Sequence, residues 1–424
     1  MRKALTIAGS DSGGGAGIQT DLKTFAALGV YGTSVITALT AQNTLGVHGI
    51  HAVPAPFVAA QLEAVLSDIP VDAAKTGMLQ DAEIIRTVAS VLAARNFSQL
   101  VVDPVMVAES GDRLLREDAV DALRTELLPL ALIVTPNLPE TSVLIGHPVA
   151  TIAEMTEAAY EIHRLGPRYV LVKGGHLQGP ETIDIFFDGK KVHRLPAKRL
   201  ASNHTHGSGC TYAAAITAYL ARGLEPLPAV RAAKQFITAA IAHGFPVGGG
   251  YGPTNPMAGL WHDAESVRIP RELAAAAKLI RHSDLKTILP ADKQLVLLYC
   301  RDEASTPADV AVLTMTVAEE RDRPQAEAIQ WGEKTNMAEA LLAARQKSPQ
   351  LQALLAFPEL PGLAAAAKAA RGTPAAFGTV PPENASGLLL LSQDGQFLLF
   401  AVTPQDAVRK LLELLALAVS DTFK

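Results

Sequence analysis

The amino-acid sequence predicts an α/β fold with a mostly parallel central sheet, followed by a second, smaller α/β or α+β domain. Two observations predict the first part. Between about residues 4 and 244, short β-rich runs alternate with amphipathic helical stretches, and several of the β-rich runs are apolar on both faces. A third observation, a lapse of this regular pattern, predicts that another domain follows. The length of 424 residues allows two or three domains.

Strands and covering helices are expected to alternate through the first part. The strands are expected at 5–8, 31–39, 73–76, 100–105, 132–135 and 169–173. The helices are expected at 18–28, 56–67, 81–95, 118–128, 152–165, 210–222 and 227–243. One hairpin interrupts this order, because residues 182–187 and 190–195 flank Asp188-Gly189, a pair that readily takes the positive φ angles of a tight turn.

The pattern lapses over the glycine- and proline-rich residues 246–256 and again over 263–272, which include Pro270. We therefore expect a first domain at 1–264, a linker with a connecting helix at 265–290, and a C-terminal domain at 291–424. In this last part the sequence predicts an alanine-rich helix at 271–281, strands at 295–299 and 387–391, and helices at 337–345 and 404–417.

The composition predicts a folded protein that binds neither nucleic acid nor membranes. Hydrophobic residues make up 49% of the chain and charged residues 19%, which provides apolar surface for a large core. The formal charge is −5, and no long block of like charges offers the basic surface that nucleic acid requires. No apolar run approaches the about 18 residues of a membrane helix, and the chain shows no signal-peptide core.

The cysteine content predicts a cytoplasmic location. Cys210 and Cys300 are the only cysteines, and they form no C-x-x-C pair. A disulfide framework and a zinc cluster are therefore not expected, which is typical of a reducing compartment.

The first candidate site is a glycine-rich turn between the strand at 5–8 and the helix at 18–28. Glycines let backbone N–H groups approach a ligand, and the helix start adds unpaired donors. The turn matches neither the dinucleotide fingerprint, because Ile18 stands in place of the third glycine, nor the Walker motif, because Gly15 follows Gly14. A flexible turn without a ligand, with Asp21 as an ordinary N-terminal helix acid, remains the alternative.

The second candidate site is the segment 203–211, which precedes an apolar helix. Gly207, Ser208 and Gly209 are small enough for successive N–H groups to converge on an anion, as the transfer of a phosphoryl group requires. Cys210 at the helix start is expected to have a lowered pKa and to serve as a base or acid near the transferred group. The alternative is a small buried cysteine in a packed turn.

Further polar residues follow the expected strands, at the sheet edge where α/β proteins bind ligands. Asn137 and Glu140 can hold a hydrated Mg²⁺ and a phosphate, because Mg²⁺ prefers a few protein oxygens and keeps its waters. The same pair is equally typical of a helix start, with Asn as N-cap and Glu three residues on. Asp103 and Lys173 end two other strands.

These segments, taken in order, resemble the hydroxymethylpyrimidine/phosphomethylpyrimidine kinases of thiamine biosynthesis, which belong to the ribokinase-like superfamily. The resemblance covers roughly residues 3–262. It implies a ribokinase-like three-layer fold, a homodimer, and ATP- and Mg²⁺-dependent phosphorylation of 4-amino-5-hydroxymethyl-2-methylpyrimidine and then of its monophosphate. The matching segments are 6–23, 34–44, 75–79, 103–106 with 110–112, 135–140, 172–176 and 205–211.

The resemblance also implies roles for individual residues. Gln42 matches the residue that binds the aminopyrimidine, and the donor and acceptor of its amide suit that edge. Cys210 stands where most sugar kinases of the superfamily carry Asp. A cysteine at this position is characteristic of pyrimidine kinases and of some pyridoxal kinases. The remaining implied positions are Asp21, Gly9 and Met78 beside the pyrimidine, Gly207 to Cys210 as the anion hole, Asn137 and Glu140 for Mg²⁺ and phosphate, and Asp103, Lys173 and Thr205 near the ATP phosphates.

Two other functions remain open for this part of the chain. Pyridoxal or pyridoxine kinases act on a hydroxymethyl group of a ring of similar size. A non-catalytic sensor of thiamine precursors is the other alternative, although such a module does not need Cys210, Asn137, Glu140 and Lys173 together.

Residues 282–424 resemble the thiamine-phosphate synthase domain that is fused after such kinases, chiefly in archaea. The similar segments are 284–290, 309–311, 331–345 and 403–408. The Arg and His of that family's active site have no counterparts in 314–317 or 333–336. We therefore expect a degenerate domain that senses a ligand or forms dimers; an active synthase and an unrelated module are the alternatives.

Overall fold

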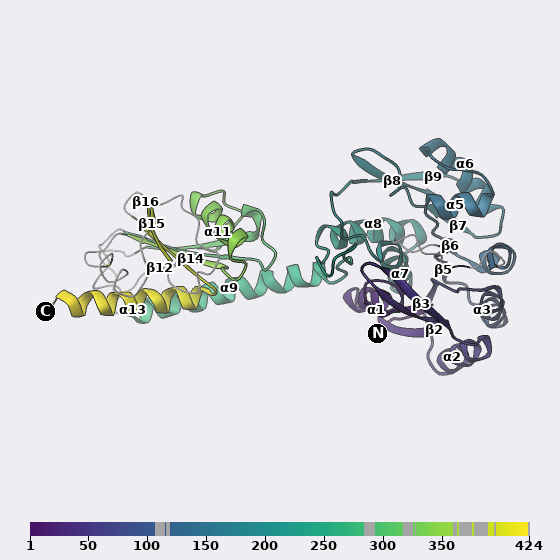
Figure 1. Ribbon diagram of the computed structural model, residues 1–424, viewed down its shortest axis with the longest axis horizontal. Coiled ribbons are helices and arrows are strands. Elements are labelled where there is room, and N and C mark those ends of the chain that lie inside the picture. The colour runs from purple at the N-terminus through teal and green to yellow at the C-terminus, as the bar shows by residue number, and fades with distance from the viewer. Residues whose placement is uncertain are drawn as a thin grey trace. The chain divides into compact units, whose positions relative to one another are not determined.

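The computed structural model describes residues 1–106, 115, 119–283, 293–316, 325–326, 328–358, 363, 375–376, 389–393 and 396–422. The chain divides into two compact units (Figure 1). The N-terminal unit is Met1–Leu260, and the C-terminal unit is Trp261–Lys424.

The N-terminal unit is built on a nine-stranded sheet of order β3-β2-β1-β4-β5-β6-β7-β8-β9. Strands β2, β1, β4, β5, β6 and β7 pair in parallel, whereas β3, β8 and β9 are antiparallel to their neighbours. The mostly parallel sheet predicted from the sequence is thus confirmed. The strands are β1 (Lys3–Asp11), β2 (Tyr31–Asn43), β3 (Gly46–Ala52), β4 (Ala73–Thr76), β5 (Leu100–Val102), β6 (Ile133–Val134), β7 (Tyr169–Val172), β8 (Glu181–Phe187) and β9 (Val192–Lys198).

Helices cover both faces of this sheet and make three layers. In β7, Val170 and Val172 pack into one core with α2, α3, α5 and α6, whereas Leu171 packs into the other with α1, α7 and α8. This is why the strands are apolar on both faces. The helices are α1 (Gly17–Ala27), α2 (Ala55–Asp68), α3 (Ala82–Ala94), α4 (Ala119–Ala122), a π-helical turn (Leu123–Leu127), a 3₁₀ turn (Leu128–Leu130), α5 (Leu138–Ile145), α6 (Ile152–His163), α7 (Ser208–Ala221) and α8 (Pro226–Ala242).

The predicted hairpin is confirmed as β8 and β9, which turn at Asp188-Gly189 with Gly189 at φ +83°. The sequence did not predict β3, because this edge strand is largely exposed and carries two glycines and two histidines. The single helix expected at 118–128 is a mixed helical stretch, in which α4 passes into the π-helical turn and then into the 3₁₀ turn that contains Pro129.

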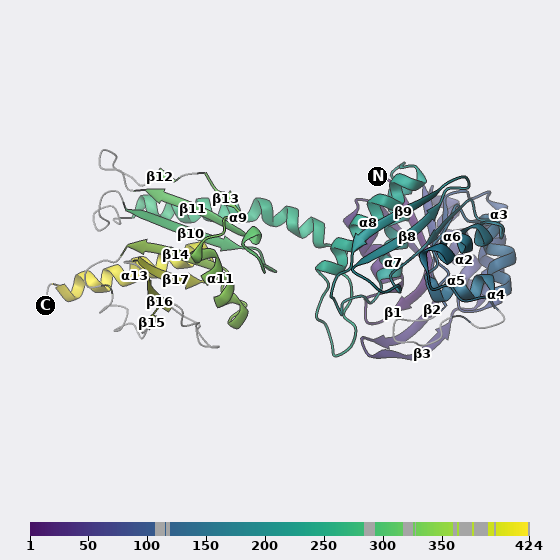
Figure 2. The same cartoon turned by 90° about the horizontal axis from the view of Figure 1, so that it is seen from above.

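The C-terminal unit holds a mainly antiparallel sheet of order β12-β11-β10-β14-β17-β16-β15, with β13 paired to β11 (Figure 2). Helices α9 and α13 share a core with one face of this sheet, and α11 packs on the other face. This is the α+β arrangement that the sequence predicted. The elements are α9 (Ala258–His282), β10 (Gln294–Cys300), a 3₁₀ turn (Pro307–Asp309), β11 (Val310–Thr316), β12 (Gln325–Ala326), β13 (Gln330–Trp331), α11 (Asn336–Lys347), β14 (Ala353–Pro358), β15 (Ala375–Ala376), β16 (Leu389–Gln393), β17 (Gln396–Ala401) and α13 (Pro404–Thr422).

The irregular stretch predicted at 263–272 is wrong, because α9 runs through it with Pro270 in its interior. Ile269, Leu273, Ala276 and Ile280 are buried at helical spacing along one side of α9, and their packing against the sheet outweighs the cost of the proline. The motif segments 110–112 and 284–290 lie outside the described residues. No helix in the described ranges is long and apolar enough to cross a membrane.

We expect Leu273→Ala to destabilise the C-terminal unit by about 2–5 kcal/mol, because it removes a buried aliphatic side chain from the contact between α9 and the sheet. Both tryptophans of the chain, Trp261 and Trp331, lie in this unit, so their fluorescence during urea unfolding of the full chain reports on it. The matched control is Leu279→Ala on the same helix, whose side chain is 38% exposed. Equal effects of the two substitutions would contradict the packing described here.

Candidate active site

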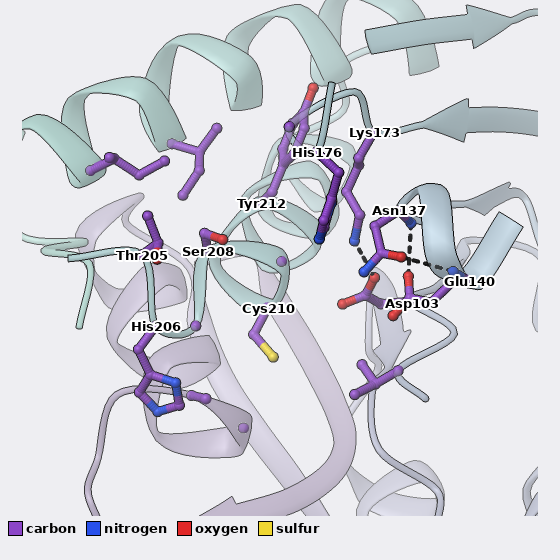
Figure 3. Close-up of a pocket in the computed structure, with 18 of the residues that line it drawn as sticks. Asp103, Asn137, Glu140, Lys173, His176, Thr205, His206, Ser208, Cys210 and Tyr212 are labelled. Atoms are coloured by element: carbon purple, nitrogen blue, oxygen red, sulfur yellow. Dashed lines mark hydrogen bonds and ion pairs between the residues drawn. The ribbon is translucent and has the colours of Figure 1, made fainter. Parts of the chain in front are cut away.

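A cavity of about 410 Å³ lies at the C-terminal ends of the parallel strands (Figure 3). It collects residues from the ends of β1, β5, β6 and β7 and from the start of α7, which is where α/β sheets bind ligands. Twelve of the thirteen residues predicted from the sequence line it: Gly9, Gln42, Met78, Asp103, Asn137, Glu140, Lys173, Thr205, Gly207, Ser208, Gly209 and Cys210.

Asp21 is the exception, and its predicted place beside the pyrimidine is wrong. Its side chain is fully buried on the sheet side of α1. Both carboxylate oxygens lie 3.0 Å from Lys75 Nζ, and Thr6 Oγ1 donates a hydrogen bond of 2.6 Å to Oδ2. Asp21 therefore forms a buried ion pair beneath the cavity.

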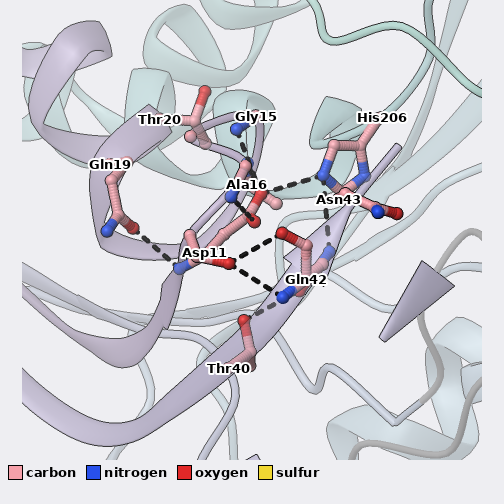
Figure 4. Close-up of polar contacts among 12 residues, drawn as sticks. Asp11, Gly15, Ala16, Gln19, Thr20, Thr40, Gln42, Asn43 and His206 are labelled. Carbon is pink, nitrogen blue, oxygen red and sulfur yellow. Dashed lines mark hydrogen bonds and ion pairs between the residues drawn. The ribbon is translucent and has the colours of Figure 1, made fainter. Parts of the chain in front are cut away.

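The glycine-rich turn is organised around Asp11, which the sequence analysis did not single out (Figure 4). The backbone N–H groups of Gly13, Gly15 and Ala16 donate to the Asp11 carboxylate at 2.8, 3.0 and 2.8 Å. These donors are thus used within the turn, contrary to the expectation that they approach a ligand. Burial raises the pKa of Asp11, but its hydrogen bonds with His206 and with backbone N–H groups outweigh burial and hold the pKa below its usual value.

His206 joins this turn to the start of α7. Its Nε2 lies 2.9 Å from Asp11 Oδ2 and 3.5 Å from Gln42 Nε2 (Figure 4). The two segments approach closely because both are glycine-rich: a Cβ at Gly15 would overlap the His206 ring, and one at Gly207 would overlap the Gly15 carbonyl oxygen. Gly207 also has φ +77°, which favours glycine. The signal that could have found His206 is its position directly before Gly207.

The start of α7 provides donors for an anion. Gly207 is the N-cap residue, and no side chain caps the helix in the described part of the chain. The Ser208 N–H donates to the Thr205 carbonyl oxygen at 3.0 Å. The Gly209 and Cys210 N–H groups of the first turn are therefore the donors placed to bind a negative group at the positive end of the helix dipole. Ser208, Gly209 and Cys210 of this turn all line the cavity.

The expectation that Cys210 has a lowered pKa is wrong. Burial raises the pKa of its thiol to about 11. Lys75 opposes this rise, Asp21 and Asp103 add to it, and a hydrogen bond from the Gly17 backbone lowers it. Loss of hydration and two nearby carboxylates therefore outweigh the helix start, and Cys210 is a thiol at neutral pH.

Opposite charges gather at the other strand ends. Lys173 Nζ lies 2.8 Å from Asp103 Oδ1, and Thr135 Oγ1 donates to the same oxygen at 2.9 Å. Asn137 and Glu140 form a reciprocal capping box at the start of α5, with bonds of 2.8 and 2.9 Å, and both also line the cavity. Asn137 and Glu140 therefore cap the start of α5 and also line the cavity, so the two roles considered for them do not exclude each other.

Glu140 and Asp103 make this end of the cavity suitable for a cation. Burial raises the pKa of Glu140 to about 7; Lys173 opposes the rise and Asp103 adds to it. Two neighbouring carboxylates with excess negative charge fit a divalent cation that keeps most of its ligands as water and phosphate oxygens. Within the described ranges, no group of three or more His, Cys, Asp or Glu forms an all-protein metal site.

The wall beyond Lys173 was not predicted from the sequence. Asp184 accepts hydrogen bonds from the Gly174 backbone at 2.9 Å, Tyr212 Oη at 3.2 Å and Lys234 Nζ at 2.7 Å. A Cβ at Gly174 would overlap the Ile183 carbonyl oxygen, so glycine is required for this approach. Asp184 thereby fixes the loop after β7 against α7 and α8.

We expect Cys210 to react slowly with iodoacetamide at pH 7–8 and progressively faster as the pH rises toward 11. The reason is that only the thiolate is nucleophilic and the pKa of Cys210 is about 11. Because the chain has two cysteines, a Cys300→Ala background leaves Cys210 as the single thiol, and mass spectrometry then gives its rate of modification. A rate that levels off below pH 8.5 would contradict the geometry described above.

Comparison with known proteins identifies the family. The family model described as phosphomethylpyrimidine kinase matches residues 11–255. The hydroxymethylpyrimidine/phosphomethylpyrimidine kinase of Rhizobium meliloti is 55% identical over 264 residues, which are 61% of this chain and 98% of that protein. The thiamine biosynthesis bifunctional protein ThiED of Geobacter sulfurreducens is 55% identical over 251 residues, which are 59% of this chain and 51% of that protein, so the chain spans about half of its length.

A solved structure shows the same fold. The ADP complex of Bacillus subtilis pyridoxal kinase matches with a TM-score of 0.57 and 42% identity, covering 61% of this chain and 98% of that one. The ribokinase-like fold expected from the sequence is therefore confirmed. Since the family model matches more than half of its residues, the chain belongs to the phosphomethylpyrimidine kinase family.

Proposed function

We propose that the N-terminal unit transfers the γ-phosphoryl group of ATP to the hydroxymethyl group of 4-amino-5-hydroxymethyl-2-methylpyrimidine, and then to the resulting monophosphate. Family membership and the names of its relatives support this activity. One observation carries the proposal for the site: Gln42, the uncapped start of α7 with Cys210, and the Lys173–Asp103–Glu140 group line one cavity. Each end of that cavity suits one reactant.

The pyrimidine is proposed to bind between β1, β2 and the segment after β4. The Gln42 amide offers a donor and an acceptor to the amino group and ring nitrogen of the pyrimidine. Gly9 and Met78 line the cavity beside it, and a Cβ at Gly9 would lie 3.1 Å from Met78 Sδ, so glycine keeps this space open. The hydroxymethyl group is then directed toward α7.

The phosphoryl group is proposed to be held at the start of α7. The backbone N–H groups of Gly207, Gly209 and Cys210 stabilise the negative charge of its oxygens, and such fixed donors supply most of the catalysis in phosphoryl transfer. Because Cys210 keeps its proton at neutral pH, its thiol donates to the transferred group, whereas a thiolate would repel it. Of the two roles expected from the sequence, base or acid, this is the acid, with a raised rather than a lowered pKa.

ATP is proposed to place its phosphates near Lys173, Asp103 and Thr205, with Asn137 and Glu140 oriented toward a Mg²⁺ ion. A Mg²⁺ ion held there by Asn137, Glu140 and its own waters would neutralise the charge of the phosphates. Lys173 is within 2.8 Å of Asp103 and supplies the fixed positive charge at this end. The chain's own carboxylates then orient the hydrated cation.

The proposed function is tested by mass spectrometry of the products that the full-length protein forms from ATP, Mg²⁺ and one acceptor at a time. The acceptors are hydroxymethylpyrimidine, its monophosphate and pyridoxal. We expect the pyrimidine mono- and diphosphates. Pyridoxal phosphorylation is the second candidate, favoured by the match to Bacillus subtilis pyridoxal kinase. Product from pyridoxal alone would overturn the proposal, and binding without any product would indicate a sensor.

We expect Cys210→Ala to lower kcat by about 100- to 1000-fold, the size of the loss when one donor to a developing charge is removed. The KM for hydroxymethylpyrimidine should change little, because the thiol acts on the transferred group. Steady-state kinetics with both substrates gives the two constants separately. Full turnover by this variant would exclude the role given to Cys210.

We expect Gln42→Leu to raise the KM for hydroxymethylpyrimidine by about 10- to 100-fold, since it leaves the amino group and ring nitrogen of the pyrimidine unpaired in the cavity. The KM for ATP is the internal control and should stay within about twofold. An equal rise in both constants would show that Gln42 is not a pyrimidine ligand.

For the whole protein we propose a cytoplasmic homodimer. Two free cysteines support a reducing compartment, and Leu39, Leu45 and Ile50 around the exposed edge strand β3 give an apolar surface that a second copy can cover. Sedimentation equilibrium tests the dimer, with a monomer at micromolar concentration as the contrary result.

For the C-terminal unit we propose a degenerate ligand-sensing or dimer-forming role. Its support is the resemblance over 309–311, 331–345 and 403–408 together with the absence from the sequence of Arg or His at 314–317 and 333–336. Formation of thiamine phosphate when the thiazole phosphate is added to the product assay would instead indicate an active synthase.

A further inference from the structure

We propose that Lys75, held in place by Asp21, is a positioning residue for phosphoryl transfer: its buried ammonium group fixes a positive charge behind the Cys210 sulfur and the start of α7. The inference rests on the proposed function, because it gives the Lys75 charge a role in the phosphoryl transfer proposed to take place at the start of α7. Neither residue lines the cavity.

The pair is fully buried and well defined. Lys75 on β4 is paired in register with Thr6 on β1, so both side chains project from the same face of the sheet. The Lys75 ammonium lies 3.0 Å from each Asp21 oxygen, and Thr6 donates to Asp21 Oδ2 at 2.6 Å. Neither Lys75 nor Asp21 has any exposed side-chain surface. Burying two charges is costly, and a buried ion pair is weak evidence for a contribution to stability.

Helix α1 connects this pair to the cysteine. Gly17, at the start of α1, donates its backbone N–H to Cys210, and Asp21 lies one turn further along the same helix. Thr20 Oγ1 lies 3.3 Å from Thr211 Oγ1, so α1 and α7 also touch next to the cysteine. Gly77 leaves room for the ammonium group, because a Cβ there would lie 3.4 Å from Lys75 Nζ and 3.0 Å from Ala8 Cβ.

Four charged groups act on Cys210 from the elements around it. They are Lys75 from β4, Asp21 from α1, Asp103 after β5 and Lys173 after β7. Lys75 lowers the pKa of the thiol, and the two carboxylates raise it. Lys173 lines the cavity and is placed to bind phosphates, whereas Lys75 is enclosed and no substrate can reach it.

Lys173 and Lys75 therefore have different roles. Lys173 meets the phosphates directly, and Lys75 keeps its charge beneath the thiol whether or not substrate is bound. A fixed cation in a site of low polarity stabilises negative charge that develops at the transferred group without any reorganisation. Removing Lys75 should therefore affect kcat and the ionisation of Cys210, and leave substrate affinity nearly unchanged.

The test uses the full chain in the Cys300→Ala background, with Lys75→Met and Asp21→Asn as neutral substitutions of similar size. The first readout is the pH midpoint of Cys210 alkylation by iodoacetamide, which requires no substrate. We expect Lys75→Met to move the midpoint upward by about one pH unit and Asp21→Asn to move it downward, because one removes a positive and the other a negative charge. The second readout is kinetic: Lys75→Met should lower kcat at least 10-fold, with both KM values within about twofold.

Lys3→Met is the matched control. It is the same substitution at a lysine that is also paired, 4.0 Å from Asp72, at the opposite end of β1. It should leave the midpoint and kcat unchanged. Thermal unfolding by circular dichroism shows which variants are folded. If Lys75→Met does not fold, the proposal is tested by Asp21→Asn alone, which should lower the pH midpoint of Cys210 alkylation.

The proposal is overturned if the folded Lys75→Met variant keeps its kcat, or if the folded variants leave the midpoint unmoved or both move it in the same direction, because opposite charges near the thiol must shift its pKa in opposite directions. Failure of the proposed function looks different. In that case the wild type forms no phosphorylated pyrimidine, while the alkylation midpoints still respond to the two substitutions.

Discussion

The candidate site depends on the contact between the glycine-rich turn after β1 and the start of α7. Asp11 and His206 bond across this contact, and Gly15 and Gly207 permit it by lacking side chains. Segments nearly two hundred residues apart are thereby held together, with Gln42 on one side and the α7 donors on the other. Any side chain at Gly15 or Gly207 would separate the two halves of the cavity, because backbone and ring atoms already occupy that space.

The balance of buried charge is the second constraint. Burial raises the pKa of Glu140 to about 7; Lys173 opposes the rise and the neighbouring Asp103 adds to it. Burial raises the pKa of the Cys210 thiol to about 11; Lys75 lowers this pKa, and Asp21 and Asp103 raise it further. A cation bound near Asp103 and Glu140, as proposed above, would offset the negative charge of these two carboxylates.

Much of the fold could be predicted from the sequence because buried positions carry apolar residues. Val170, Leu171 and Val172 are apolar in succession since both faces of β7 are covered, and Asp188-Gly189 marks the turn of the β8–β9 hairpin. The continuation of α9 through Pro270 could not be predicted, because a proline in the sequence indicates a helix end. The helix continues because its buried side packs against strands that lie far from it in the sequence.

The site residues, like the fold, could be predicted only where the sequence itself carries the information. Asp103, Asn137, Glu140 and Lys173 were found because they stand at strand ends, and strand ends meet at one edge of a parallel sheet. Asp21 was misplaced because sequence order gives no information on which side of α1 faces the sheet at that turn. The pKa of Cys210 was misjudged because it depends on Asp21, Asp103 and Lys75, which only the folded chain brings near it.

Pyrimidine and phosphates are proposed to occupy the two ends of one cavity. The most direct measurement is a crystal structure of the protein with hydroxymethylpyrimidine and a non-hydrolysable ATP analogue with Mg²⁺. We expect the pyrimidine against the Gln42 amide, with its hydroxymethyl oxygen facing the γ-phosphoryl group at the start of α7. A pyrimidine bound away from Gln42, or phosphates bound away from Gly207–Cys210, would contradict it.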